Sequence, residues 1–165
     1  MACSDDDSSE DGASSEDSTA QASSDGGCPF DAGELSDATG ITMEEAAAPA
    51  GAPDTLRCVF VQEGKDLTDI TSFTIASVDL PDSEPLADLR VGFAAQGNTE
   101  DLPELGEDAF VRTSTATGGT EDELLREAVV TYRDGDVVAT VVLAGVVPEA
   151  QVATATAGVV SLLSD

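Results

Sequence analysis

Hydrophobic residues alternate with polar ones, or run together, in six short segments of the chain, and each such segment predicts a β-strand. The segments are residues 41–47, 56–62, 71–80, 109–114, 124–133 and 136–146. In the second segment Leu56, Cys58 and Phe60 lie two residues apart, so they share the face that we expect to be buried.

The last two segments predict a β-hairpin, because Asp134-Gly135 between them is a strong signal for a two-residue type I′ turn. In the register that this turn implies, Arg133 faces Asp136. Residues 137–146 are apolar on both faces, which predicts a central strand that is covered on both sides.

Three other segments follow the helical period. The first, residues 31–40, has Asp31 as its N-cap and Gly40 in the left-handed position that ends a helix. The second, residues 85–97, begins at Pro85 and should end at Gly97, and the third is residues 148–163. The residues expected to face inward are Leu35, Ala38, Leu86, Leu89, Phe93, Val152, Ala155, Val159 and Leu162.

The predicted order is helix, three strands, helix, three strands, helix. Hairpin-length links favour a mostly antiparallel sheet of about five to six strands with helices packed on it, which is an α+β fold. After the first helix the order strand-strand-strand-helix occurs twice, and this favours an internal repeat. We assign residues 28–165 to this single globular domain.

The first 27 residues differ in composition from the rest of the chain. They hold eight acidic residues and eight serines, with no basic residue and no Leu, Ile, Val, Phe or Tyr. Such a segment cannot bury enough apolar surface to offset the entropy of ordering, so residues 1–27 are predicted to be disordered. We interpret them as a tether that holds the domain off a surface; a solvated tail without a specific role is the alternative.

Acidic residues dominate the whole chain, with 34 Asp and Glu against 6 Lys and Arg, no His, and a net charge of −28. Because eight of the acids lie in the tail, residues 28–165 keep a net charge of −20. This balance argues against nucleic-acid binding, which needs a basic surface, and favours cationic partners. The longest nearly apolar run, residues 137–147, is too short to span a bilayer.

Cys3 directly precedes the acidic tail, in Met1-Ala2-Cys3-Ser4. This arrangement resembles the mature start of a bacterial lipoprotein, in which the first Cys receives diacylglycerol after a small residue. No positively charged, apolar signal peptide precedes the tail, so we expect Met1 to stand in place of a removed one. We therefore predict lipidation at Cys3; an ordinary Cys near a cytoplasmic N-terminus is the alternative.

Cys28 opens the predicted domain and Cys58 lies on the buried face of an early strand. A disulfide between Cys28 and Cys58 would tie the first helix to that strand and would require an oxidising compartment, in agreement with export. Two reduced, buried thiols are the alternative. A zinc site is not favoured, because two Cys without His or a second Cys pair cannot complete a tetrahedral shell.

Several of these features occur in the same order in a family of actinobacterial lipoproteins of uncharacterised function, which this chain resembles. They are the tail after Cys3, the short helix after Cys28-Pro29-Phe30, Cys58 in an early strand, and a C-terminal amphipathic helix. Residues 105–110, Leu-Gly-Glu-Asp-Ala-Phe, also resemble the family's Leu-Gly-acid-x-Ala-aromatic segment. The resemblance implies export, a lipid anchor and a structural disulfide, and it supplies no catalytic residue. The Asp-rich composition would also suit a lipoprotein of a salt-loving archaeon.

No arrangement of residues in the chain indicates catalysis. A serine nucleophile needs a base, and His is absent, while Lys65, the only Lys, lies in a polar turn. Gly-x-Ser-x-Gly, P-loop and dinucleotide motifs are lacking. Arg126 and Arg133 fall on opposite faces of one predicted strand, so the arginines do not converge on an anion. We predict no catalytic residues and no cofactor.

Two acidic loops have the carboxylates that Ca²⁺ prefers, but neither has the spacing of an EF-hand. The first contains Glu100, Asp101, Glu104, Glu107 and Asp108, and the second is residues 121–123. We interpret both as solvated acidic surface and predict no metal site.

The sequence therefore predicts an exported, lipid-anchored, non-enzymatic accessory protein that binds a protein partner at the outer face of the cell membrane, and the charge of the domain favours a cationic partner. Membrane contact is expected through the lipid on Cys3 only. The first alternative is a lipoprotein that binds a small molecule in a pocket between sheet and helix. The second, less favoured, is an enzyme that uses carboxylates and a metal.

Overall fold

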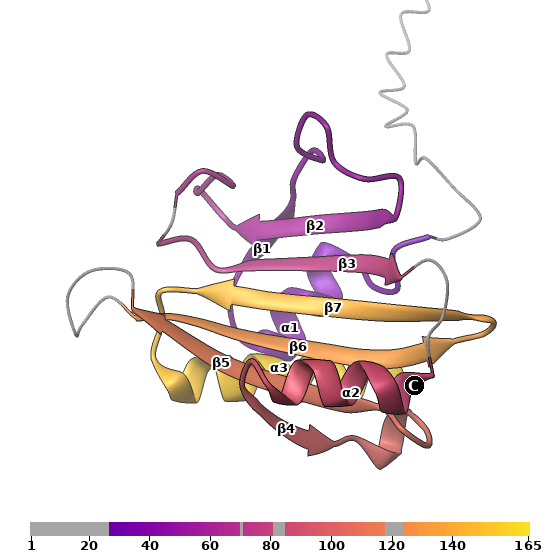
Figure 1. Cartoon of the computed structure of the whole chain (residues 1–165). Coiled ribbons are helices and arrows are strands. Elements are labelled where there is room, and N and C mark those ends of the chain that lie inside the picture. Colours follow the sequence, from indigo (N-terminus) through magenta and orange to yellow (C-terminus); the bar gives the residue numbers. More distant parts are fainter. Residues whose placement is uncertain (1–26, 70, 81–84, 118–123) are drawn as a thin grey trace, which may run out of the picture.

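Within residues 27–69, 71–80, 85–117 and 124–165, which the computed structural model describes, seven strands form one open sheet with three helices packed on it (Figure 1). The strands are β1 (Met43–Glu45), β2 (Leu56–Gln62), β3 (Thr74–Leu80), β4 (Asn98–Asp101), β5 (Phe110–Thr117), β6 (Leu124–Asp134) and β7 (Val137–Gly145). The helices are α1 (Ala32–Thr39), α2 (Leu86–Ala94) and α3 (Glu149–Ser164), with a 3-10 turn η1 (Pro103–Leu105).

The strands are ordered β1-β2-β3-β7-β6-β5-β4, and all neighbours are antiparallel. This confirms the α+β class and the antiparallel sheet. The sheet has seven strands, one more than the six segments that were predicted to be strands. The additional strand, β4, reads Asn-Thr-Glu-Asp and has no hydrophobic alternation, so only its pairing with Phe110–Thr113 of β5 makes it a strand.

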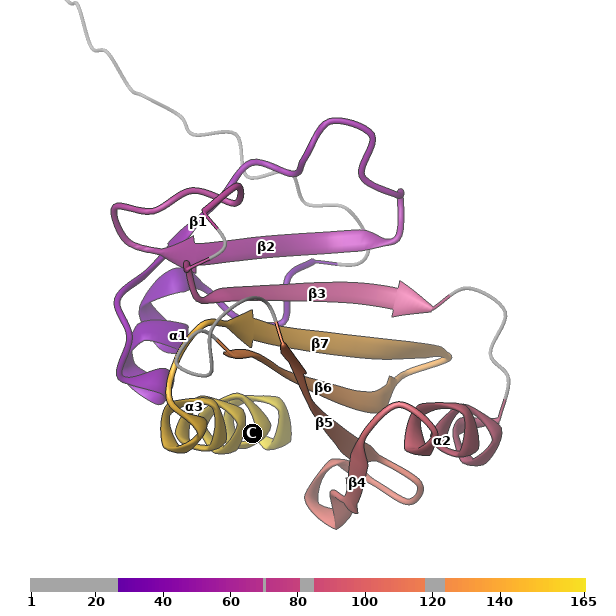
Figure 2. The same ribbon diagram turned by 60° about the vertical axis from the view of Figure 1, so that its left-hand side comes forward.

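The helices cover opposite faces of the sheet, as Figure 2 shows. Val111 of β5 belongs to the buried core together with Val152 and Val159 of α3, and α1 packs on α3. Phe110, the next residue of β5, packs against Phe93 of α2, with ring centroids 5.7 Å apart. Because successive strand residues point to opposite faces, α1 and α3 lie on one face and α2 on the other.

The predicted repeat is matched only roughly. The first half has three strands before α2, and the second has four before α3. Since α2 and α3 also cover opposite faces of the sheet, the two halves are not equivalent copies.

The core between the sheet and the pair α1 and α3 is built mainly from aliphatic side chains, in line with the 4% of aromatic residues in the sequence. Ile75, Val141 and Leu143 of the sheet and Val159 of α3 are fully buried there. The helices α1 and α3 approach so closely that a Cβ on Gly158 would come within 2.1 Å of the Ala38 carbonyl oxygen. Gly158 therefore lets the two backbones touch.

Both predicted ends of α1 are confirmed, whereas the predicted C-terminal end of α2 is wrong. Asp31 accepts a hydrogen bond from the Glu34 amide at 2.8 Å in a reciprocal capping box, and Gly40 adopts the left-handed conformation at φ 70°. Helix α2 ends at Ala94, three residues before the predicted Gly97. Gly97 instead packs on the backbone of β5, where a Cβ would come within 2.3 Å of the Thr113 carbonyl oxygen.

The β6–β7 hairpin is present, but its turn lies one residue later than predicted. Asp134 pairs with Val137, so the two-residue loop is Gly135-Asp136, and Arg133 faces Val138 rather than Asp136. Gly135 has φ 60° while Asp136 stays outside the left-handed region, a pattern that fits a type II′ turn better than type I′. Strand β7 is central, as predicted.

One predicted face is also wrong. The register between β2 and β3 shifts between Leu56 and Cys58, so Arg57 is the extra residue of a β-bulge. Cys58 and Phe60 point toward α1 and α3 and are buried, whereas Leu56 pairs with Val78 on the other face. The bulge places the Arg57 side chain on the face that α1 and α3 cover, where it reaches Asp79 and Asp134.

Candidate functional site

A groove of about 830 Å³ runs between α3 and the sheet margin formed by β4 and β5. We call it the α3 groove. Its apolar part comes from Val111 and Leu102 on the sheet side and from Val152 and Val160 on α3. Its polar part is formed by Gln96, Asn98, Glu100, Glu104, Thr113, Ser114, Thr115, Arg126, Glu127, Glu149 and Thr156.

Strand and helix periodicity explain why these side chains meet. Residues 111, 113 and 115 alternate onto the face of β5 that looks toward α3, while Val152, Thr156 and Val160 recur every four residues along the helix. Ala153 and Ala157 also line the groove from α3, and both are exposed. These small side chains leave space that larger ones would fill, so the groove is a consequence of the sequence of α3.

The rim of the α3 groove is acidic. Four glutamates line it against one arginine, Arg126, whose Nη1 donates to the carbonyl oxygen of Val147 at 2.7 Å. Glu127 is compensated, because it is ion-paired with Arg112. The other three glutamates, Glu100, Glu104 and Glu149, leave a net negative charge at the groove.

Arg112 belongs to the opposite face of the sheet, where it helps to hold α2. Its guanidinium carbon lies 5.5 Å from the centroid of the Phe93 ring, in cation–π geometry, and its side chain is 9% exposed. Arg112 therefore has a structural role behind the groove and does not offer a positive charge to a ligand.

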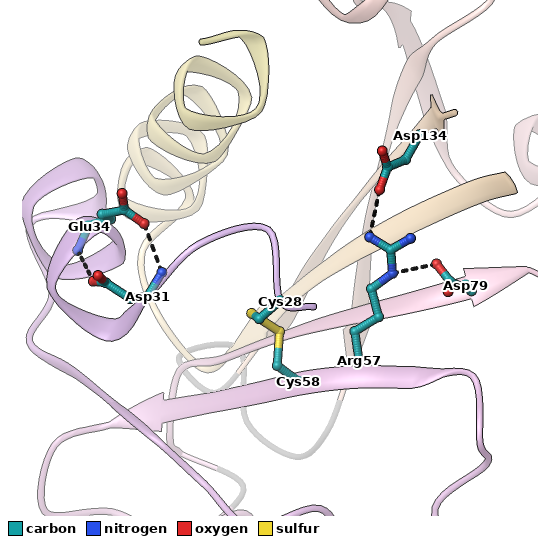
Figure 3. Close-up of a disulfide and its surroundings, with 7 residues drawn as sticks. All are labelled: Cys28, Asp31, Glu34, Arg57, Cys58, Asp79 and Asp134. Atoms are coloured by element: carbon teal, nitrogen blue, oxygen red, sulfur yellow. Dashed lines mark hydrogen bonds and ion pairs between the residues drawn. A yellow bond between two sulfur atoms is a disulfide. The ribbon is translucent and has the colours of Figure 1, made fainter. Parts of the chain in front are cut away.

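The predicted disulfide is confirmed. Cys28 and Cys58 are bonded, with their Cα atoms 5.6 Å apart, and join the segment before α1 to β2 (Figure 3). The predicted lipidation site Cys3 and residues 1–26 of the tether lie outside the described residues, so their assignment remains a prediction. The disulfide is on the face of the sheet that α1 and α3 cover, and neither Cys lines the α3 groove.

Beside the disulfide, Arg57 joins two carboxylates from two other strands (Figure 3). Its Nε lies 2.6 Å from Asp79 Oδ1 of β3, and its Nη1 lies 2.6 Å from Asp134 Oδ2 of β6. Burial would lower the pKa of Arg57, but the bonds and charges of Asp134 and Asp79 outweigh it and raise that pKa. The cluster links the N-terminal and C-terminal strands of the sheet.

Tyr132 borders this charged cluster. Burial raises the pKa of its phenol to about 12, and the negative charge of Asp134 adds to the effect. The side chain is only 6% exposed, and its hydroxyl has no hydrogen-bond partner among the residues that the structure describes. A neutral, high-pKa phenol does not serve as a general base at neutral pH.

The acidic loops do not form a metal centre in the described part of the chain. No group of three or more His, Cys, Asp or Glu side chains there is placed to hold a metal ion, and residues 121–123 lie outside it. The segment 105–110 has a structural role. Gly106 and Asp108 take positive φ values of 115° and 70°, and the turn that they make buries Ala109 and Phe110.

Sequence reasoning did not identify the α3 groove. The alternation of Val111, Thr113 and Thr115 and the small residues of α3 were visible signals, but β4, which forms the other wall, was not predicted. Arg126 and Arg133 do lie on opposite faces of β6, as expected: only Arg126 lines the groove, while Arg133 is on the other face.

None of the helices in the described ranges has the length and hydrophobicity needed to cross a membrane. Comparison of the chain with protein-family models, curated proteins and solved structures finds no match. The resemblance to the actinobacterial lipoproteins therefore remains a prediction from the sequence.

Proposed function

We propose that this protein is an exported, lipid-anchored accessory protein without enzymatic activity, and that its domain binds a cationic segment of a protein partner in the α3 groove. The Cys28–Cys58 disulfide supports export, because such bonds form and persist in oxidising compartments. Acylation of Cys3 would place the domain at the outer face of the cell membrane, since two or more acyl chains give stable anchoring.

The acidic α3 groove carries the binding part of this proposal. Five of the six basic side chains of the protein already have partners within the fold, namely Arg57, Lys65, Arg90, Arg112 and Arg126. The acidic excess therefore faces outward largely uncompensated. A field of one sign speeds the encounter with partners of opposite charge and repels acidic ones.

The acidic tether fits the same account. Anionic lipid headgroups would repel its eight carboxylates, so the tether would hold the domain away from the bilayer and leave the groove accessible. Removing the tether should then reduce partner binding on membranes without reducing it in solution.

Site-specific photo-crosslinking tests the proposed function. A photoreactive residue replaces Ala153, in the groove, or Val91, which is 73% exposed on α2 on the opposite face. With membranes of the native organism, we expect a protein adduct from position 153 only, which weakens as the salt concentration rises beyond about 0.15 M. Equal adducts at both positions, no adduct, or a salt-independent adduct would contradict the proposal.

The second candidate function is binding of a small molecule in the same groove. The groove volume of about 830 Å³ and its mixed apolar and polar lining favour it, because such pockets hold drug-sized ligands. Native mass spectrometry of the protein purified from its own organism distinguishes the two. A co-purifying small molecule that is lost when Ala157 is replaced by Trp would favour this candidate.

A further inference from the structure

Strand β5 extends beyond its neighbour β4. β4 pairs with residues Phe110–Thr113, and its last partner is Thr113, opposite Asn98. Residues 114–117 pair with β6 on one side only, within the part of the chain that the structure describes. This leaves four residues of β5 as a free strand edge.

The direction of the backbone groups on this edge follows from the ladder. The Leu102 amide donates to the Ala109 carbonyl at 2.9 Å, so residue 109 directs its backbone groups toward the β4 side. In an antiparallel sheet alternate residues bond to the same neighbour. The register of β5 with β6 is regular, so Thr115 and Thr117 direct their N–H and C=O groups toward the free edge.

Gly97 explains why β4 stops where it does. Its backbone lies so close to the Thr113 carbonyl oxygen that a Cβ would sit 2.3 Å away. The chain preceding Gly97 leads back to α2 on the other face, so β4 cannot continue alongside Thr115. The edge opens instead into the α3 groove, which Thr113, Ser114 and Thr115 line.

None of the residues that the structure describes gives this edge the usual protection. Natural sheets shield free edges with Lys, Pro or β-bulges, but residues 114–117 read Ser-Thr-Ala-Thr and pair regularly with β6. Thr115 is exposed. Unpaired backbone groups next to a groove are the geometry that other proteins use to capture extended peptides by strand addition.

We propose that an extended segment of the partner adds to the sheet as a short strand along residues 114–117 of β5, with Lys or Arg side chains directed toward Glu100 and Glu149. This inference rests on the proposed function, since it specifies how the cationic partner binds. Charge complementarity selects the occupant. The protein's own first 27 residues carry eight acids and no base, and a second copy carries a net charge of −28, so the acidic groove repels both.

The test uses the full chain and a synthetic peptide of alternating Lys and Val residues, with binding measured by calorimetry and by amide exchange. Two further peptides carry backbone N-methyl groups on either the Lys or the Val residues, which blocks hydrogen bonding along one edge and keeps the charge. We expect one methylated peptide to lose about tenfold or more in affinity and the other to bind normally. Bound peptide should slow exchange of the Thr115 amide.

Two protein variants complete the test. Thr115→Pro removes an amide that the sheet does not use, so the protein should keep its melting temperature and lose peptide affinity. Thr115→Val retains that amide and should therefore bind the peptide more tightly than Thr115→Pro. Strand addition is wrong if both methylated peptides bind as tightly as the unmethylated peptide and if Thr115→Pro binds the unmethylated peptide as tightly as the unaltered protein does. An acidic binding groove would still stand in that case. If no Lys-Val peptide binds, or if Glu100→Gln with Glu149→Gln leaves its affinity unchanged, the proposed function fails as well.

Discussion

Breaking the Cys28–Cys58 disulfide should lower the free energy of unfolding by about 4 kcal/mol. The two residues are 30 apart in the sequence, and the chain-entropy model assigns a closed loop of that length roughly this stabilisation through the unfolded state. Divided by the unfolding entropy of a domain of this size, this loss of free energy corresponds to a fall of about 13 °C in melting temperature. Reduction by a thiol reagent is the cleanest perturbation, because it changes no other atom of the fold.

The assay is thermal unfolding followed by circular dichroism, with and without reductant, after thiol titration has confirmed that the bond is open. The Cys28→Ala variant is the control: it should melt at a lower temperature from the start and should show no further shift with reductant. If the fully reduced protein melted within about 2 °C of the oxidised one, the disulfide would not constrain the chain, and its use as support for export would lose its basis.

Three further predictions concern the packing of the domain. Tyr132 is the only Tyr and Trp is absent, so tyrosinate absorbance should report a single titration near pH 12; Asp134→Asn should lower that pKa and Arg57→Met should raise it. Because the folded-state pKa is raised, about 3 kcal/mol of stability should be present below pH 10 and should be lost as the pH rises toward about 12, measured by denaturant titration. Arg57→Met should also lower the free energy of unfolding by about 1–2 kcal/mol at neutral pH. This is less than the loss expected from breaking a fully buried ion pair, because Asp134 is 48% exposed. An unchanged free energy of unfolding would refute the linking role of this cluster. Gly158→Ala should cost about 1–3 kcal/mol through its clash with α1, whereas Gly92→Ala, which meets no atom within 4 Å, should gain about 0.5–1 kcal/mol, and equal effects in thermal melts would contradict the helix contact.

Local signals in the sequence predicted most of the elements. Hydrophobic alternation located six of the seven strands, and capping residues located both ends of α1, because these features depend on neighbours in the chain. The missed strand β4 has no alternation of its own and depends on β5 for its conformation. The turn residues of the β6–β7 hairpin were displaced by one position, since Gly-Asp and Asp-Gly loops offer competing registers.

Features that depend on distant parts of the chain could not be predicted. The bulge at Arg57 moves Leu56 to the other face, and its stabilising partners Asp79 and Asp134 come from strands far along the sequence. The α3 groove requires β4 to begin no earlier than Asn98, which follows from the close approach of Gly97 to β5. The disulfide was the exception, because only two cysteines belong to the domain and one of them lies on a buried strand face.

Intact-mass and peptide mass spectrometry of the protein isolated from membranes of its native organism tests the central claim most directly. The proposal predicts an N-terminal peptide that begins at Cys3 and carries diacylglycerol, together with a peptide pair joined through Cys28 and Cys58. Recovery of the protein from the cytoplasm, without acyl chains and with all three thiols reduced, would contradict it.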